Sequence, residues 1–438
     1  MGEYFHSVRV VPERCIGRMA CLKACPTEAI RVRHGKAEIL EDRCIDCGEC
    51  ARACRQNAIV PQTSSFTEFS EFKYTVALVS PVLYGQFRKD VLPNTILAAV
   101  RRIGFDDACD VACASEAVSA AIDEHLAGYR GPLPLLSPFC PTIVRLIQAR
   151  YPSLIDLLIP IDSPMEIAAR EVRNRKMKEL GLRRDEIGVI YLTPCPAKMV
   201  GIKYPPRKAA SHIDGAIAIS EIYRSLLSAL GEMNNSAYEM EEPVTGMGLG
   251  WPVLGGQVSS LRAESSLAVG GLGDVERILD EIERGRLGDI QFVECHACAQ
   301  GCCGGSLMVG DPYVIRGTIL SLVARFGKAP CQDRGKIREL YQRRYFSLPG
   351  QISSRPFAPL DKDIGKAIEK RKRVQEIHEG LPQINCGACG APTCLSFAED
   401  VVLGRAQFED CVVLTARQVR RTADTPSGLA SEPQVLAL

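Results

Sequence analysis

Short apolar runs alternate with longer amphipathic stretches over most of this chain. Runs of the first kind, each expected to form a buried strand, cover residues 74–79, 134–136, 187–192, 213–219 and 289–293. Stretches with helical periodicity follow, at residues 94–103, 163–181, 221–230 and 275–283. Such an alternation predicts an α/β fold, in which helices cover a mostly parallel sheet.

Three of the predicted strands lead into cysteines. Cys140 follows the run at 134–136, Cys195 follows 187–192, and both Cys298 and Cys302 follow 289–293. Thiolates are soft ligands that select iron–sulfur clusters, zinc or copper, and α/β sheets bind ligands at the ends of their strands. Each cysteine alone would be interpreted as an ordinary core residue. Together they predict a shared metal site at one sheet edge.

The glycines Gly304 and Gly305 directly follow the Cys-x3-Cys pair. Because glycine has no side chain and tolerates positive φ, this pattern predicts a close approach of the backbone to a bulky neighbour. Trp251 is expected to pack beside a glycine-rich turn. Five further cysteines are expected not to be ligands, with the first two on one helix: Cys109, Cys113, Cys295, Cys303 and Cys331.

The N-terminal segment, residues 8–61, carries two cysteine runs. The second is a complete Cys-x2-Cys-x2-Cys-x3-Cys run, a spacing typical of bacterial ferredoxins, where each run's fourth cysteine serves the other cluster. This spacing predicts one complete [4Fe–4S] cluster, held by Cys44, Cys47, Cys50 and Cys25. Zinc is the alternative metal for such runs.

The second N-terminal site is incomplete. Its cysteines would be Cys15, Cys21 and Cys54, but Arg18 stands at the fourth position. Arginine is a poor ligand because its guanidinium stays protonated. We expect this site to hold a three-iron cluster, a four-iron cluster with an outside ligand, or no cluster.

A third complete four-cysteine set lies near the C-terminus, on a small helical unit at residues 381–414. Its members are Cys386, Cys389, Cys394 and Cys411. The charged residues 361–379 predict a solvated helix leading into this unit, and the polar tail from Arg420 onward is expected to be disordered.

The composition narrows the functional class. The chain has 438 residues, a formal net charge of +1 and 20 cysteines. Balanced charge gives no basic surface for nucleic acid, and no apolar run is long enough to span a bilayer. The start of the chain lacks the apolar core of a signal peptide, so clustered cysteines favour metal binding in the cytoplasm over disulfides.

The three central loops carry a resemblance to a known family. SPFCP at 137–141, TPCPAK at 193–198 and ECHACAQGCCGG at 294–305 resemble the signature motifs of the catalytic domain of [FeFe]-hydrogenases. The N-terminal cysteines resemble that family's accessory ferredoxin domain. INCGACGAPTC, at 384–394, resembles a four-cysteine [4Fe–4S] domain of electron-transfer proteins.

The resemblance implies a domain plan and a two-lobed α/β catalytic domain. The plan is a ferredoxin-type α+β domain at 1–61, a linker at 62–73, the H-cluster domain at 74–347, a linker and helix at 348–378, the small helical four-cysteine domain at 379–415, and a disordered tail at 416–438.

The resemblance also implies site residues. Cys140, Cys195, Cys298 and Cys302 would hold the cubane of the H-cluster. Cys302 would bridge the cubane to a di-iron subcluster with carbon monoxide, cyanide and dithiolate ligands. Lys198 matches the lysine that hydrogen-bonds an iron-bound cyanide, a role that suits a compact ammonium donor.

Several positions depart from the family's pattern. Phe139 stands where the family has a proton-relay cysteine, Thr193 and His296 replace methionines, and Gly201 replaces a glutamate. The relay carboxylates of typical members are not matched around residues 120–125. With SPVLYGQF at 80–87, these features are closer to divergent branches to which sensory roles are assigned, although no PAS-type sensor domain follows.

The sequence therefore predicts an iron–sulfur oxidoreductase that reversibly reduces protons to dihydrogen, slowly, in hydrogen sensing or electron delivery. Its expected partners are a ferredoxin or redox enzyme and the maturation machinery of the H-cluster. The alternative is a non-catalytic electron carrier that holds a cubane without a di-iron subcluster.

Overall fold

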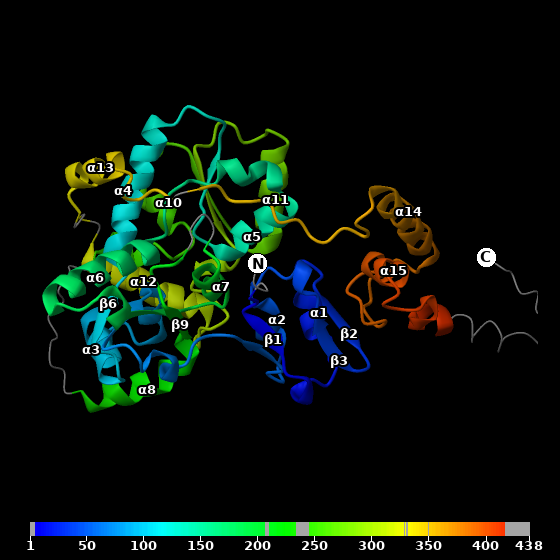
Figure 1. The fold of residues 1–438 in the computed structure, drawn as a ribbon, viewed down its shortest axis with the longest axis horizontal. Coiled ribbons are helices and arrows are strands. Elements are labelled where there is room, and N and C mark those ends of the chain that lie inside the picture. The colour runs from blue at the N-terminus through cyan, green and yellow to red at the C-terminus, as the bar shows by residue number, and fades with distance from the viewer. Residues whose placement is uncertain are drawn as a thin grey trace, which may run out of the picture. The chain divides into compact units, whose positions relative to one another are not determined.

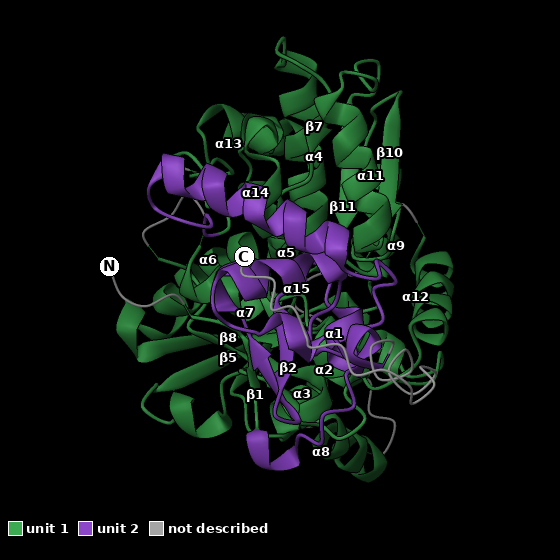
Figure 2. Ribbon diagram, turned by 90° about the vertical axis from the view of Figure 1, so that its right-hand side faces the viewer, with its two compact units in different colours: residues 1–11, 44–357 green, residues 12–43, 358–438 purple. Residues whose placement is uncertain are grey.

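The computed structural model describes residues 5–205, 210–233, 245–327, 329, 332–348 and 350–416. The chain divides into two compact units, which Figure 2 shows in different colours. Unit 1 comprises Met1–Val11 and Cys44–Phe357, and unit 2 comprises Pro12–Arg43 and Ala358–Leu438. Among the described helices, none has both the length and the apolar character that crossing a membrane requires.

Unit 1 contains two parallel sheets. The larger has the order β6 (Asp107–Asp110), β5 (Tyr74–Val79), β8 (Ile187–Thr193) and β9 (Gly215–Ala218). The smaller has the order β10 (Ser266–Gly270), β11 (Phe292–His296) and β7 (Leu135–Leu136). A separate antiparallel pair joins β1 (Val8–Val10) to β4 (Ile59–Pro61).

Both faces of the larger sheet are buried, which explains why its strands read as continuous apolar runs. Val76 and Leu78 of β5 pack on one face, whereas Ala77 and Val79 pack on the other. The helices of unit 1 are α2 (Glu49–Ala53), α3 (Pro93–Arg102), α4 (Ala112–Gly128), α5 (Pro141–Arg150), α6 (Pro164–Leu180), α7 (Ala197–Lys203), α8 (Ile219–Glu232), α9 (Gly246–Gly250), α10 (Gly256–Ser260), α11 (Leu272–Glu283), α12 (Pro312–Phe326) and α13 (Arg334–Gln342), most of them labelled in Figure 1.

Local signals explain several boundaries. Pro141 opens α5, where its missing N–H is not needed. Gly181 ends α6 with φ of 67°, a conformation that glycine adopts easily. Short 3-10 helices cover Pro12–Arg14, Glu41–Arg43, Phe66–Phe69, Pro81–Gln86, Pro152–Leu157, Arg184–Glu186 and Phe408–Asp410.

The structure corrects three expectations. The strands that lead to the central cysteines belong to two sheets, since β8 lies in the larger and β7 and β11 lie in the smaller. The strand expected at 289–293 is β11, which covers Phe292–His296 and so begins and ends three residues later. It can include Glu294 and His296 because these buried polar residues satisfy each other. Cys109 and Cys113 do not share a helix: Cys109 lies on β6 and Cys113 on α4.

Unit 2 joins two segments that are far apart in the sequence. The N-terminal segment supplies α1 (Ala20–Ala24) and the antiparallel hairpin of β2 (Ile30–Arg33) and β3 (Lys36–Ile39). The C-terminal segment supplies α14 (Ile364–Gly380) and α15 (Cys394–Val402), which pack on each other through Val374 and Phe397. Val374 is the one buried residue of α14, so the predicted solvated helix is confirmed.

Candidate metal centre

Three loops of unit 1 bring four thiols to one place. Cys140 precedes α5, Cys195 lies between β8 and α7, Cys298 follows β11, and Cys302 ends β12 (Ala299–Cys302). The four interact electrostatically: Cys140 and Cys302 act on Cys195, and all three act on Cys298. Burial raises the pKa of Cys195 to about 12 and that of Cys298 well above its usual value. Four half-buried cysteines whose thiols interact with one another repel when ionised and fit a thiolate-bound cluster, which supplies the compensating positive charge.

The glycine-rich loop approaches the loop of Cys195 backbone to backbone. A Cβ built on Gly305 would lie 2.2 Å from the carbonyl oxygen of Pro194, and that oxygen accepts the Leu307 N–H at 2.9 Å. Gly305 itself does not have positive φ; within this loop Gly301 does, at 65°. The close backbone approach predicted for the glycines thus occurs at Gly305, and the neighbour it approaches is Pro194.

Lys198 lies in the first turn of α7 and is half-buried. Its Nζ is 4.0 Å from the sulfur of Met165 and 5.6 Å from the centre of the Tyr191 ring. Burial acts to lower the pKa of Lys198, but Tyr191 and the thiols of Cys302 and Cys195 outweigh it, so the pKa is raised. The side chain therefore places a positive charge among the cysteines.

A buried hydrogen-bond network also reaches Cys302. His296 Nε2 is 2.8 Å from Glu294 Oε1, and Glu294 also accepts the N–H groups of Gly255 and Val258 at 2.9 and 3.0 Å. Burial acts to lower the pKa of His296, but hydrogen bonds to Cys302 and Glu294 raise it to about 10. Burial likewise acts to raise the pKa of Cys302, and the His296 hydrogen bond and the charge of Lys198 lower it overall.

Sequence reasoning gave Glu294 no role. A usable signal was present, because residues two apart on a strand share one face. Glu294 and His296 therefore point to the same side of β11, and each satisfies the other in a fully buried place.

Phe139 is a packed side chain next to Cys140, at the position where the family resemblance expects a cysteine. It is 7% exposed, and its ring lies 5.1 Å from that of Trp251 at an angle of 58°. The indole N–H of Trp251 donates to Ser119 Oγ at 3.0 Å. A cavity beside Phe139 is lined also by Met165, Ala197 and Val200.

The acidic residues near the unmatched relay stretch are engaged elsewhere. Asp123 pairs with Arg334 at 2.9 Å, and Glu124 pairs with Arg338 at 2.9 Å. Both therefore link α4 to the α13 region.

The complete ferredoxin-type run touches the centre within unit 1. A Cβ on Gly48, between Cys47 and Cys50, would lie 2.3 Å from Ser306 Oγ and 3.0 Å from Pro196 Cγ. The Arg52 guanidinium donates to the carbonyl oxygen of Gly304. The loop of Cys44, Cys47, Cys50 and Cys54 therefore lies against the second and third loops of the centre.

The first run lies in unit 2, where Cys15 and Cys21 are buried and Cys25 is half-buried. Backbone N–H groups donate to two of these sulfurs, from Ala37 to Cys15 at 3.3 Å and from Ala29 to Cys25 at 3.2 Å. Such bonds stabilise cluster sulfur. Arg18 is exposed. The exchange of fourth ligands between the two runs stays a prediction.

The C-terminal cysteines line one small pocket of unit 2. Cys386, Cys389, Cys394 and Cys411 all border it, with Phe397 and Val413 among the apolar walls. Cys411 is buried, whereas Cys386 is exposed. Cys295 and Cys303 are fully buried in apolar clusters of unit 1, and Cys331 and the tail residues 417–438 lie outside the described residues.

Three family models match the chain. Residues 73–266 match the C-terminal domain of the iron-only hydrogenase large subunit, residues 7–55 match a 4Fe–4S dicluster domain, and residues 381–413 match an Fe–S cluster family. These matches cover both N-terminal cysteine runs and the C-terminal cysteine set. They also cover the loops of Cys140 and Cys195, but not the loop of Cys298 and Cys302.

Two relatives are similar in sequence. The NADP-reducing hydrogenase subunit HndD of Solidesulfovibrio fructosivorans is 24% identical over 334 residues, which is 62% of this chain and 56% of that protein. The corrinoid/iron-sulfur protein large subunit of Moorella thermoacetica is 42% identical over 53 residues, 12% of either chain. This chain thus matches about half of the first relative and a small part of the second.

Solved structures share the fold. An apo variant of [FeFe]-hydrogenase HydA1 from Chlamydomonas reinhardtii gives a TM-score of 0.51 at 16% identity, covering 67% of this chain and 97% of that one. A second variant gives 0.50 at the same identity, covering 65% and 95%. These matches confirm the resemblance inferred from the motifs: this chain has the fold of [FeFe]-hydrogenases, and segments similar to 4Fe–4S and Fe–S families lie on either side of the region similar to the hydrogenase large subunit.

Proposed function

We propose that this chain is an [FeFe]-hydrogenase-like oxidoreductase that reversibly combines two protons and two electrons into dihydrogen, at a slow rate. The observation that carries the proposal is the environment of Cys302. This thiol lies among three others, and Lys198 and His296 both lower its pKa. A core cysteine that merely packs needs neither cation.

The residues present fit an H-cluster. Cys140, Cys195, Cys298 and Cys302 would hold its cubane, and Cys302 would bridge to the di-iron subcluster. When bound, the di-iron subcluster would supply the site where protons and electrons combine. Lys198 would donate a hydrogen bond to an anionic ligand of that subcluster, since its half-buried ammonium lies beside Met165 and Tyr191 and has no carboxylate partner within the described part of the chain.

The protein around Cys302 would fix and tune the bridge. His296 donates a hydrogen bond to this sulfur, and Glu294 holds the imidazole in place through its own backbone contacts. Hydrogen bonds from a second layer of residues orient metal ligands and tune the metal. Phe139 can neither donate nor accept a proton, which is why we propose slow turnover.

Electrons would reach the centre through iron–sulfur clusters. We propose three [4Fe–4S] clusters and one incomplete site at Arg18, fed by a ferredoxin or another redox protein. The cluster of the run at Cys44 to Cys54 would pass electrons to the central site, because the loop of this run touches Ser306 and Gly304.

A second function is favoured by one observation. The ring of Phe139 packs against that of Trp251 at an angle of 58°, so apolar rings occupy the place where the family resemblance expects a proton-relay cysteine. A protein with that arrangement could hold the cubane and carry electrons without a di-iron subcluster.

Isotope exchange separates the two functions. Protein matured with the H-cluster machinery would be kept under D2 in ordinary water, and HD would be measured. We expect HD from the native protein and none from Cys302→Ser. A native protein that holds all its clusters but forms no HD would favour the electron carrier.

A further inference from the structure

We propose that the C-terminal four-cysteine module is fixed on the first ferredoxin-type run, so that its cluster exchanges electrons directly with the N-terminal clusters to which that run contributes ligands. The C-terminal module here means residues 358–416, and the first run means residues 12–43. The proposal rests on the iron–sulfur clusters of the proposed function and is independent of the di-iron subcluster.

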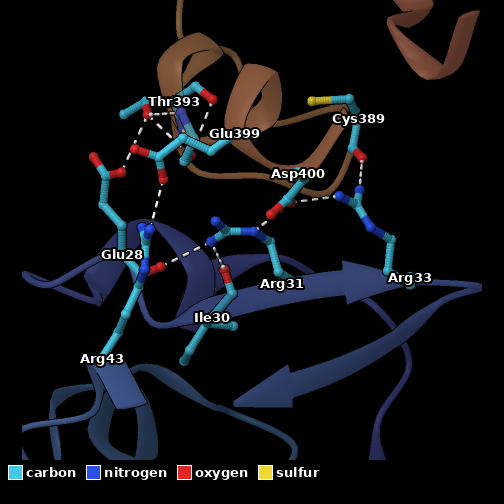
Figure 3. Close-up of polar contacts among 10 residues, drawn as sticks. Glu28, Ile30, Arg31, Arg33, Arg43, Cys389, Thr393, Glu399 and Asp400 are labelled. Atoms are coloured by element: carbon cyan, nitrogen blue, oxygen red, sulfur yellow. Dashed lines mark hydrogen bonds and ion pairs between the residues drawn. The ribbon is translucent and has the colours of Figure 1, made fainter. Parts of the chain in front are cut away.

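Buried ion pairs hold the two segments together (Figure 3). Asp400 of α15 accepts hydrogen bonds from Arg31 Nε and from Arg33 NH2, the latter at 2.7 Å. The side chains of Arg31 and Asp400 are 3% and 1% exposed. A buried pair is retained only when its geometry offsets the loss of hydration, so this contact indicates a permanent interface rather than a loose tether.

A second pair lies beside the first. Arg43 NH2 is 2.6 Å from Glu399 Oε2, and the two side chains are 17% and 13% exposed. The Thr393 hydroxyl donates to Glu28 Oε2 at 3.2 Å. Contacts therefore reach α15 from both sides of the hairpin.

The cysteine loops themselves are in contact. Val32 N–H donates to the carbonyl oxygen of Gly390 at 2.8 Å, and a Cβ on Gly390 would lie 1.9 Å from the carbonyl oxygen of Val32. A Cβ on Gly387 would lie 3.3 Å from Leu22 Cδ2, next to Cys21. Gly387 and Gly390 flank Cys389, so the ligand loop of one cluster lies on the helix that carries a ligand of the other.

Arg33 connects the interface to the backbone of a proposed cluster ligand, Cys389. Its NH1 donates to the carbonyl oxygen of Cys389, while its NH2 binds Asp400. In the transfer step one cluster loses one electron and its neighbour gains it, with no bond made or broken. Because Cys386 is exposed while Cys411 is buried, the C-terminal cluster would meet an external electron donor or acceptor at its Cys386 side.

The test is electron paramagnetic resonance of the fully reduced holoprotein, together with hydrogen exchange. Two neighbouring reduced clusters broaden each other's signals, and the signal followed is that of the C-terminal cluster, because the N-terminal sites are neighbours of each other in every variant. Asp400→Asn removes the shared carboxylate charge, and Arg33→Gln weakens the same contact from the other segment. Glu376→Gln is the matched control, because Glu376 pairs with Arg373 on the exposed face of α14.

We expect broadened signals in the native protein and in Glu376→Gln, and narrower signals in Asp400→Asn and Arg33→Gln at unchanged iron content. Exchange of the amides in β2 and in residues 386–394 should become about a hundredfold faster in Asp400→Asn, since breaking a buried pair strongly destabilises its contact. Unbroadened native signals would overturn the proposal, as would broadening that persists where exchange shows the contact open. Infrared bands of the di-iron subcluster test the proposed function separately, because they report only on the central site.

Discussion

The chemistry of the central site depends on what surrounds single residues. Cys302 and Cys303 are neighbours in sequence but differ in setting. Cys302 contacts His296 and lies near Lys198, whereas Cys303 is fully buried in an apolar cluster and burial raises its pKa to about 12. Two adjacent cysteines thus differ in their surroundings: Cys302 lies beside cationic groups, whereas Cys303 packs in the apolar core.

Replacing Cys302 with serine should prevent retention of the di-iron subcluster, because a hydroxyl is a hard and poorly ionised ligand. Cys303→Ser is the control, and it should leave the carbonyl bands of the infrared spectrum in place. Equal loss of these bands in both variants would show that the choice of bridging ligand is wrong.

Replacing Phe139 with cysteine should raise dihydrogen turnover in protein that holds the di-iron subcluster. A thiol can pass protons on, and groups of this kind contribute about a hundredfold or more. We expect a smaller rise, because Asp123 and Glu124 are engaged in ion pairs. Phe139→Leu, which has no ionisable group, should not raise turnover. A fully assembled Phe139→Cys variant that is no faster would show that proton delivery at this position does not limit the rate.

The sequence predicted the four central cysteines and Lys198 as a group, since their motifs and spacing are specific. It did not predict the partner of His296. Glu294 lies only two positions away on the same strand, so their shared face was visible in the sequence, but the hydrophobicity pattern did not indicate that both polar residues are buried there.

The elements were predicted best where local signals are strong. The strand at Tyr74–Val79 and the helix ending at Gly181 were predicted correctly because an unbroken apolar run and a helix-ending glycine are local features. The division of the strands between two sheets could not be predicted, because it depends on pairing between β7, β10 and β11, which are distant in sequence.

Gly305→Ala tests the contact between the loop of Gly305 and the loop of Cys195. The added Cβ would lie 2.2 Å from the Pro194 carbonyl oxygen, so the third loop must move away from the second. We expect destabilisation of about 1–3 kcal/mol, as for other overpacked sites, and a loss of iron from the central site.

Gly317→Ala is the control for this change. Gly317 is exposed in α12, and a Cβ there meets nothing within 4 Å. Alanine in a helix interior should stabilise by about 0.5–1 kcal/mol. Thermal unfolding and iron analysis measure both variants, and a Gly305→Ala protein with native stability and iron content would contradict the packing described for this loop.

At the scale of the whole molecule, the cysteines divide between the two units. The complete ferredoxin-type run and the central site lie in unit 1, and the first run and the C-terminal module lie in unit 2. The sequence indicated each cysteine group, but it could not indicate that residues 12–43 pack with residues 358–416, because the contacts join segments more than 300 residues apart.

Arg18→Cys should complete the second N-terminal site and convert it to a stable [4Fe–4S] cluster. Anaerobic iron analysis and electron paramagnetic resonance should show the gain. Arg14→Cys is the control, because it adds a cysteine at an exposed position outside the ligand spacing. No gain in Arg18→Cys would refute the exchange of fourth ligands between the two runs.

The central claim is that the site at Cys302 holds a di-iron subcluster. An infrared spectrum of the protein, produced together with the H-cluster maturation machinery, tests it most directly. Carbon monoxide and cyanide bound to iron absorb where protein does not. We expect carbonyl and cyanide bands in the native protein and their loss in Cys302→Ser. A native protein that contains its full complement of iron–sulfur clusters but lacks these bands would contradict it.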